Sequence, residues 1–236
     1  MRQANPYALV DLDASDNREG AVDDLQREQH RWRERLANLP TDHSPEARAT
    51  ILLELADCLA DLDQDREAWD QAREAFTIFA AAQRWEEVVR ACDILFRTNQ
   101  PGSMAALGQG IWLAVTYPIA ASWTVVTLQH LIEETPPESN VPPIAAAVSH
   151  YVAGLRVEDS DEGRHLLDYT QVQLALVAGR HRGVQTQDEF DAWMIGNELD
   201  EPARFLPRLA EAVDNLVQGD WWIDRDALRR KLPVND

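Results

Sequence analysis

The sequence has few residues that form covalent or metal cross-links. Only two of its 236 residues are cysteines, Cys58 and Cys92, and neither belongs to a Cys-x-x-Cys pair. A disulfide framework and a structural zinc site are therefore not expected. Both cysteines stand among apolar residues, so we expect them to be buried as small hydrophobic side chains.

Positive charge is also scarce, and it comes almost entirely from arginine. Lys231 is the only lysine, and 22 basic residues face 41 acidic ones, for a net charge of −19. Such a chain repels nucleic-acid phosphates, so we expect no nucleic acid as a partner. The acidity fits a GC-rich genome or a salt-adapted cytoplasm, and a third reading is mimicry of nucleic acid toward a DNA-binding protein.

Long hydrophobic runs are missing as well. The first residues lead into Asp11 and Asp13 without a continuous apolar stretch, so we expect no secretory signal and a cytoplasmic location. The segment 98–132 contains no Asp, Glu, Lys or Arg, but Pro118 and several polar residues interrupt it. We expect two buried helices there rather than a membrane span.

The sequence offers no catalytic signature. Gly108-Gln109-Gly110 has neither a preceding strand nor a phosphate-binding lysine, so it does not predict nucleotide binding. Ser149-His150 lies in no recognisable nucleophile elbow. We therefore expect no cofactor, and a binding protein in preference to an enzyme.

What remains predicts an all-α fold, in which antiparallel helical hairpins continue into a C-terminal helical bundle. Hydrophobic residues make up 45% of the chain and recur with helical spacing, and no segment predicts strands. We expect a loose acidic tail at 1–20, a helical domain at 21–98, a break at 99–102 and a second all-α domain at 103–236, which can be continuous with the first. The expected helices cover about 21–38, 44–62, 66–82, 83–98, 103–116, 119–134, 142–156, 161–182, a short segment after Thr186, 205–217 and 224–232.

Three helix ends carry capping signals. Ser44 before Pro45 combines an N-cap residue with proline in the first turn. Thr186 and Glu189 have capping-box spacing, and Gly183 provides a C-terminal stop. These signals fix where three of the expected helices begin or end.

One helical hairpin has a regular order of large and small residues. Its first helix carries three large apolar residues, and one small residue directly follows the second of them. Its second helix has an alanine twelve residues after that small position and another seven later. The residues in this order are Leu52, Leu55, Ala56, Leu59, Ala68 and Ala75. Residues 52–80 thereby resemble one tetratricopeptide (TPR) repeat, although Ala72 and Ala80 stand where that family prefers an aromatic ring and a proline.

The TPR resemblance implies a surface that binds another protein. In that family the concave face of the first helix meets the partner, and the corresponding positions here are Thr50, Leu53, Asp57 and Asp61. Two aspartates would favour a basic segment of the partner. The alternative is that both aspartates are the solvated side of an amphipathic helix.

A second hypothesis is a helical metal-binding enzyme or a metalloenzyme maturation factor. Glu162 and His165 form the Glu-x-x-His pair used by di-iron helical bundles, and His130 with Glu133 has the reversed spacing. Two imidazoles and two carboxylates would suit iron, manganese or zinc. The alternative is that these histidines are solvated or cap helices.

The adjacent tryptophans Trp221 and Trp222 allow two interpretations. Neighbouring indoles cannot both face one core, so one of them could form a partner-binding hot spot. Alternatively, the pair clamps a C-terminal segment onto the body of the protein. Our main functional hypothesis is a cytoplasmic adaptor, scaffold or assembly factor, and the sequence leaves its oligomeric state open.

Overall fold

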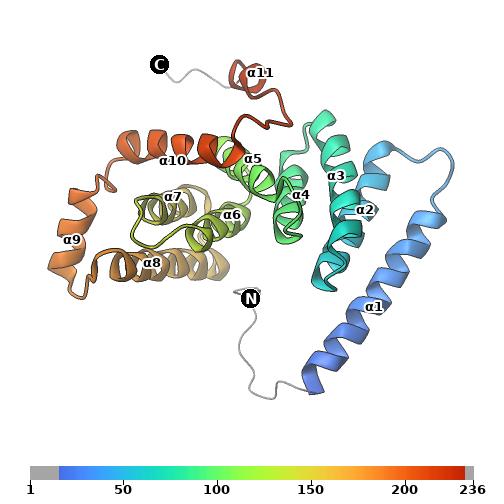
Figure 1. Ribbon diagram of the computed structural model, residues 1–236, viewed down its shortest axis with the longest axis horizontal. Helices are drawn as coiled ribbons and strands as arrows, with labels where there is room; N and C mark the ends of the chain where they lie inside the picture. Colours follow the sequence, from blue (N-terminus) through green and yellow to red (C-terminus); the bar gives the residue numbers. More distant parts are fainter. Residues whose placement is uncertain (1–15, 232–236) are drawn as a thin grey trace.

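The computed structural model describes residues 16–231, which form eleven α-helices and no strand. The all-α prediction is confirmed (Figure 1). The expected tail falls mostly outside the described residues, and its last five residues belong to the first helix. The helices are α1 (Asp16–Ala37), α2 (Pro45–Asp61), α3 (Asp65–Ala81), α4 (Trp85–Arg97), α5 (Ser103–Thr116), α6 (Ala121–Glu134), α7 (Val141–Arg156), α8 (Asp161–Arg182), α9 (Gln187–Gly196), α10 (Pro202–Val217) and α11 (Arg225–Arg229).

The predicted capping residues begin and end their helices as expected. The Ser44 hydroxyl accepts a hydrogen bond from the Ala47 amide at 3.1 Å. Thr186 and Glu189 form a complete capping box at the start of α9. Gly183 ends α8 in the left-handed conformation, with φ of 68°, which glycine adopts without steric cost.

Helices α2 to α7 pack as successive antiparallel pairs. Within the pairs, α2 packs on α3, α4 on α5 and α6 on α7, while α3 contacts α4 and α5 contacts α6. In addition α2 touches α4 and α4 touches α6, whereas no comparable contact joins α3 to α5 or α5 to α7 in the described chain. Because successive helices approach more closely on the side of α2, α4 and α6, this side is the inner face of a curved, repeat-like stack.

The turns after α2 and α3 have the same geometry, which reinforces the repeat-like arrangement. The Gln64 amide donates to the Leu59 carbonyl at 2.9 Å, and the Arg84 amide donates to the Phe79 carbonyl at 3.0 Å. Such six-to-one hydrogen bonds are typical of the Schellman motif, which needs a left-handed residue just before the donor. Gln83 fills that position in the second turn, with φ of 56°.

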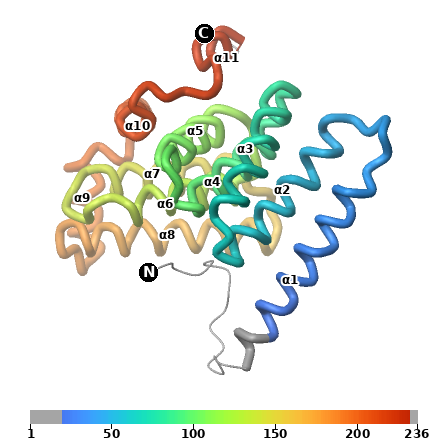
Figure 2. Tube along the Cα trace, turned by 45° about the vertical axis from the view of Figure 1, so that its right-hand side comes forward, coloured from blue at the N-terminus to red at the C-terminus, as the bar shows by residue number. Residues whose placement is uncertain are grey.

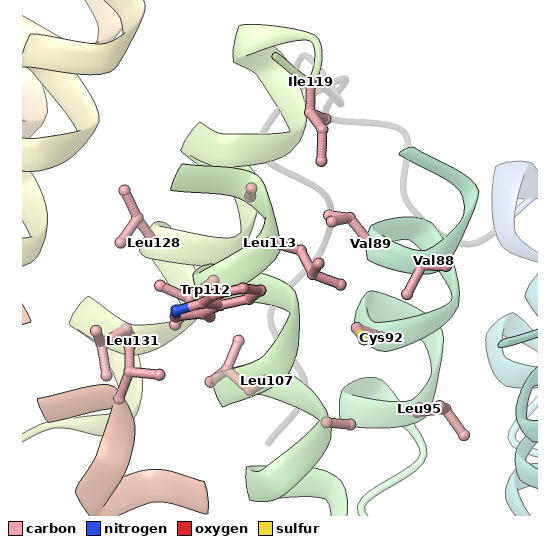
Figure 3. Packing of buried hydrophobic residues seen from close by; sticks show 14 of the residues in the cluster. Val88, Val89, Cys92, Leu95, Leu107, Trp112, Leu113, Ile119, Leu128 and Leu131 are labelled. Atoms are coloured by element: carbon pink, nitrogen blue, oxygen red, sulfur yellow. The ribbon is translucent and has the colours of Figure 1, made fainter. Parts of the chain in front are cut away.

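The uncharged helix α5 lies at the centre of the molecule. Figure 3 shows Leu107 and Leu113 of α5 between Cys92 of α4 and Leu128 of α6. Burial on several sides explains why α5 lacks charged residues, since an unpaired charge there would be costly. Within residues 16–231, no helix has the length and apolar character needed to cross a membrane. One buried hydrophobic cluster extends from Ala49 to Leu228 and spans the expected break at 99–102.

Two glycines allow other helices to approach α5 closely. A Cβ atom on Gly108 would lie 2.5 Å from Cγ2 of Val217 in α10, and one on Gly110 would lie 2.9 Å from Cβ of Cys92 in α4. Gln109 between them is fully buried, and its Oε1 accepts a hydrogen bond from the Trp222 amide at 2.8 Å. The Gly-Gln-Gly sequence is therefore a packing motif that brings three segments onto α5.

The C-terminal part of the chain covers the outer side of the stack. Helix α10 contacts α5 and α7 on the side opposite α8 (Figure 1). The chain then continues from α10 past α5 to α11, next to the end of α3 (Figure 2). Trp222 contacts Trp69 and Phe76 of α3, and Trp221 contacts Trp112 of α5, so this segment links the first helical pair to the rest of the protein.

Candidate functional site

A network of charged side chains joins α2, α4 and α6 on the inner face. Arg97 of α4 is its centre, with Nε 3.1 Å from Asp93 Oδ2, Nη1 2.7 Å from Asp61 Oδ1, and Nη2 bonded to Asp57. About two turns earlier on α4, Arg90 Nη2 lies 3.0 Å from Glu54 Oε1. The two arginines of α4 therefore pair with three carboxylates of α2.

The network continues from α4 to α6 through Asp93 and His130. His130 Nε2 lies 2.8 Å from Asp93 Oδ1, and the imidazole ring packs against Phe96 with 4.7 Å between ring centroids. Burial of Asp93 acts to raise the pKa of its carboxyl, but the hydrogen bond from His130 and the charge of Arg97 outweigh it and hold the pKa below its usual value. Asp93 is therefore an ionised, buried group with two partners.

We call this arrangement the polar face. Its side chains lie on the same side of three helices that are adjacent on the inner face of the stack. The members are Glu54, Asp57, Asp61, Arg90, Asp93, Arg97 and His130.

The four residues that the TPR resemblance assigned to partner binding occupy different environments. Thr50 is exposed, and its hydroxyl donates to the Glu46 carbonyl at 2.9 Å. Leu53 is only 1% exposed and belongs to the hydrophobic core, so it does not face a partner. Asp57 and Asp61 share the cation of Arg97, yet their side chains remain 41% and 47% exposed. Only the two aspartates combine charge with access to solvent.

The four residues of the metal hypothesis are not gathered into a site. His130 pairs with Asp93, while Glu133 is exposed and bonded to Gln129. Glu162 and His165 are exposed near the start of α8. Across the described residues, no three His, Cys, Asp or Glu side chains stand in an arrangement that could hold a metal ion.

The paired tryptophans both contact the body of the protein. Trp222 packs edge-on against Phe76 and Trp69, with ring centroids 5.3 and 6.0 Å apart. Trp221 packs against Trp112 with 6.1 Å between ring centroids, and Cζ of Arg225 lies over the Trp221 ring, 4.3 Å from its centroid. The structure thus supports the clamp interpretation, with each indole half-buried.

The two cysteines are free and buried, as the sequence predicted. Burial, with a smaller effect of the nearby Glu28 and Asp57 carboxylates, raises the pKa of the Cys58 thiol to about 12. Burial likewise raises the pKa of Cys92 far above its usual value. Neither cysteine is therefore a thiolate at neutral pH, and neither is a candidate nucleophile.

A groove beside the C-terminal clamp was not foreseen from the sequence. It has a volume of about 450 Å³ and lies between the C-terminal half of α3, the start of α4, and the segment from Trp222 to Lys231. We call it the α3–α11 groove. Its principal lining residues are Arg73, Phe76, Trp85, Trp222, Leu228 and Lys231.

Sequence reasoning also missed Asp93, Arg97 and Arg73. The four-residue spacing of Asp93 and Arg97 on one amphipathic helix was a usable signal for a local ion pair. Their long-range partners gave no local signal, because Asp57 lies 40 residues from Arg97 and His130 lies 37 residues from Asp93.

Comparison with known proteins does not extend these observations. No protein family matches the chain, and neither a curated protein nor a solved structure is significantly similar to it. The TPR resemblance therefore has no family match behind it, and the structure supports the coarser statement of packed, adjacent helix pairs.

Proposed function

We propose that this chain is a protein-binding adaptor, scaffold or assembly factor whose partner binds the polar face. The supporting observation is that three successive inner helices, α2, α4 and α6, present connected charged side chains on one side of a curved stack. Curved helical stacks use such inner faces as extended binding surfaces.

The charge of the polar face indicates the kind of partner. The face carries four carboxylates and two guanidinium groups, so negative charge remains after Arg90 and Arg97 are paired. Asp57 and Asp61 are the accessible carboxylates, and each offers an oxygen that Arg97 does not occupy. A basic segment of a partner protein would complement them and set the orientation of binding.

The test is affinity capture from the native lysate with the wild-type chain and with an Asp57→Asn, Asp61→Asn variant. Asparagine keeps the shape of both side chains and removes their charge, whereas arginine would place a new cation beside Arg97. We expect the double variant to lose the stoichiometric partner that the wild type retains.

A control variant, Asp70→Asn with Asp200→Asn, changes the net charge equally at exposed positions away from the polar face. It should retain the partner. Equal retention by the wild type and the Asp57, Asp61 variant would refute the assignment of the polar face.

The metal-binding alternative lacks comparable support. Its four residues contribute to three separate environments, and His130 is already engaged by Asp93. Metal analysis of the purified protein, before and after addition of iron, zinc or manganese, tests that alternative directly.

A further inference from the structure

The α3–α11 groove contains a cation, Arg73, that forms no ion pair with the residues that the structure describes. Other half-buried arginines have oxygen partners: Arg48 and Arg90 pair with glutamates, and Arg156 donates to backbone carbonyls of α5 and the loop after it. Arg73 makes no ion pair with any residue from 16 to 231, and its one hydrogen bond, to Thr77 Oγ1, is long at 3.4 Å. In a chain with almost twice as many acids as bases, this isolation is notable.

Aromatic rings hold the Arg73 guanidinium in place. Its Cζ lies 4.1 Å from the ring centroid of Trp222 and 5.0 Å from that of Phe76. Contacts with ring faces fix the guanidinium without using its N–H donors. Partial burial also lowers the pKa of Arg73, because the loss of water outweighs the opposing charge of Asp220, with which Arg73 forms no ion pair. The group is therefore positioned and still able to donate to an anion.

The rest of the groove is apolar, with one further cation. Phe76, Trp85 and Leu228 supply apolar walls, and Lys231, the only lysine of the chain, lines the same groove. Asp224 also lines it, but one of its carboxylate oxygens caps α11 by accepting from the Ala227 amide at 2.9 Å. The negative charge of Asp224 repels a doubly charged ligand, such as a phosphate group, more strongly than it repels a singly charged carboxylate.

We propose that the α3–α11 groove binds an acidic peptide segment of a partner protein, in which a side-chain carboxylate pairs with Arg73 and a neighbouring apolar side chain packs between Trp85 and Trp222. A volume of about 450 Å³ exceeds the needs of a carboxylate alone and accommodates adjacent side chains. The negative charge of the whole protein acts weakly at this site, because salt screens exposed charges beyond about 8 Å at physiological ionic strength.

This proposal does not depend on the polar face. The groove shares no residue with it and takes the opposite charge of ligand. A protein could lose either activity and keep the other, so the two proposals fail separately.

The test is calorimetric titration of the full chain with two capped peptides, acetyl-Phe-Glu-Phe-Glu-amide and acetyl-Phe-Gln-Phe-Gln-amide. The capped ends leave the side chains as the only source of carboxylate. We expect the glutamate peptide to bind at least tenfold more tightly, since hydrogen bonds between charged groups are roughly twice as strong as neutral ones.

Variants connect the binding to the groove. Arg73→Gln should weaken the glutamate peptide at least tenfold and leave the glutamine peptide unchanged, while Arg73→Lys should restore part of the affinity. Arg180→Gln removes an exposed cation from α8 and should have no effect. If Arg73→Gln does not fold, Lys231→Gln replaces it, because Lys231 is exposed at the end of the described chain; it should weaken the glutamate peptide at least threefold.

Several results would overturn the proposal. They are absence of binding, equal affinity for the two peptides, and unchanged affinity in the folded Arg73→Gln or Lys231→Gln variant. Phenyl phosphate is the third ligand, and tighter binding of it than of the glutamate peptide would show a small-anion site instead of a peptide groove.

Discussion

Replacement of Gly108 by alanine gives the sharpest test of how α5 is packed. In an isolated helix this substitution stabilises by about 1 kcal/mol, because alanine loses less backbone entropy than glycine. Here the new Cβ would lie 2.5 Å from Val217 Cγ2 and 3.3 Å from Leu216 Cβ, both in α10. The first distance is shorter than real contacts allow, so either the Val217 side chain must leave its rotamer or α5 and α10 must move apart.

The net effect can be worked from these two opposing contributions. Overpacking of a core costs about 1–3 kcal/mol, and a contact as short as this one belongs at the upper end. Subtraction of the gain of about 1 kcal/mol leaves a net destabilisation of about 2 kcal/mol. For a chain of this size, that lowers the midpoint of thermal unfolding by about 4–8 °C.

Gly154 provides the matched control. It is also helical, in α7, but a Cβ there would meet nothing within 4 Å. Gly154→Ala should therefore raise the midpoint by about 2–4 °C, opposite in sign to Gly108→Ala. Calorimetry or circular dichroism on the two variants measures both shifts.

A second substitution identifies the clashing atom. Val217→Ala removes the methyl group that Gly108→Ala would meet, so most of the cost of Gly108→Ala should disappear in that background. If Gly108→Ala instead stabilised the protein as much as Gly154→Ala, the close approach of α5 and α10 would be refuted.

Three further predictions concern the polar face, a buried histidine and a turn. Arg97→Met leaves the buried Asp93 without the Arg97 cation and should lower the free energy of unfolding in urea by about 2 kcal/mol. This is less than the cost of about 3–5 kcal/mol for a fully buried pair, because the Arg97 side chain is 30% exposed. An unchanged urea midpoint would contradict the network. Burial, with a smaller contribution from the charge of Arg182, lowers the pKa of His181, and Nδ1 of this residue accepts a hydrogen bond from Trp193 Nε1 at 3.0 Å. The folded protein therefore disfavours protonation of His181, so its contribution to the free energy of unfolding should be full above about pH 6.5 and fall as the pH drops below that value. In thermal unfolding from pH 7.5 to 5.5, His181→Gln should lose less stability than the exposed control His165→Gln. Equal losses of stability in the two variants would contradict the assignment of the pH dependence to His181. Gln83→Gly should raise the free energy of unfolding by about 1 kcal/mol, because glycine adopts the positive φ of that turn without a Cβ clash. A loss of stability would show that the turn relaxes to another conformation.

Helix positions could be predicted because their causes are local. The 3.6-residue apolar period and the caps at Ser44, Gly183 and Thr186 depend only on neighbouring residues. The structure places the helix ends within three residues of the predicted boundaries, except that α1 begins five residues earlier, at Asp16. The buried state of both cysteines followed in the same way from their apolar surroundings.

The candidate sites depend on contacts between distant parts of the chain. The sequence identified Asp57 and Asp61 as an acidic face, but only the packing of α4 on α2 shows that Arg97 lies between them. The Glu-x-x-His spacing suggested metal ligands, but the fold leaves Glu162 and His165 exposed and commits His130 to Asp93.

The sequence by itself determined the all-α class, the approximate positions of the helices and the excess of negative charge, since each follows from local pattern or composition. Tertiary structure alone decided that Gly108 and Gly110 serve helix packing, that Trp222 clamps the C-terminal segment, and that Arg73 contacts aromatic rings and forms no ion pair within residues 16–231. The physical reason is that these features depend on which helices meet and how closely, and side chains far apart in the chain set those distances together.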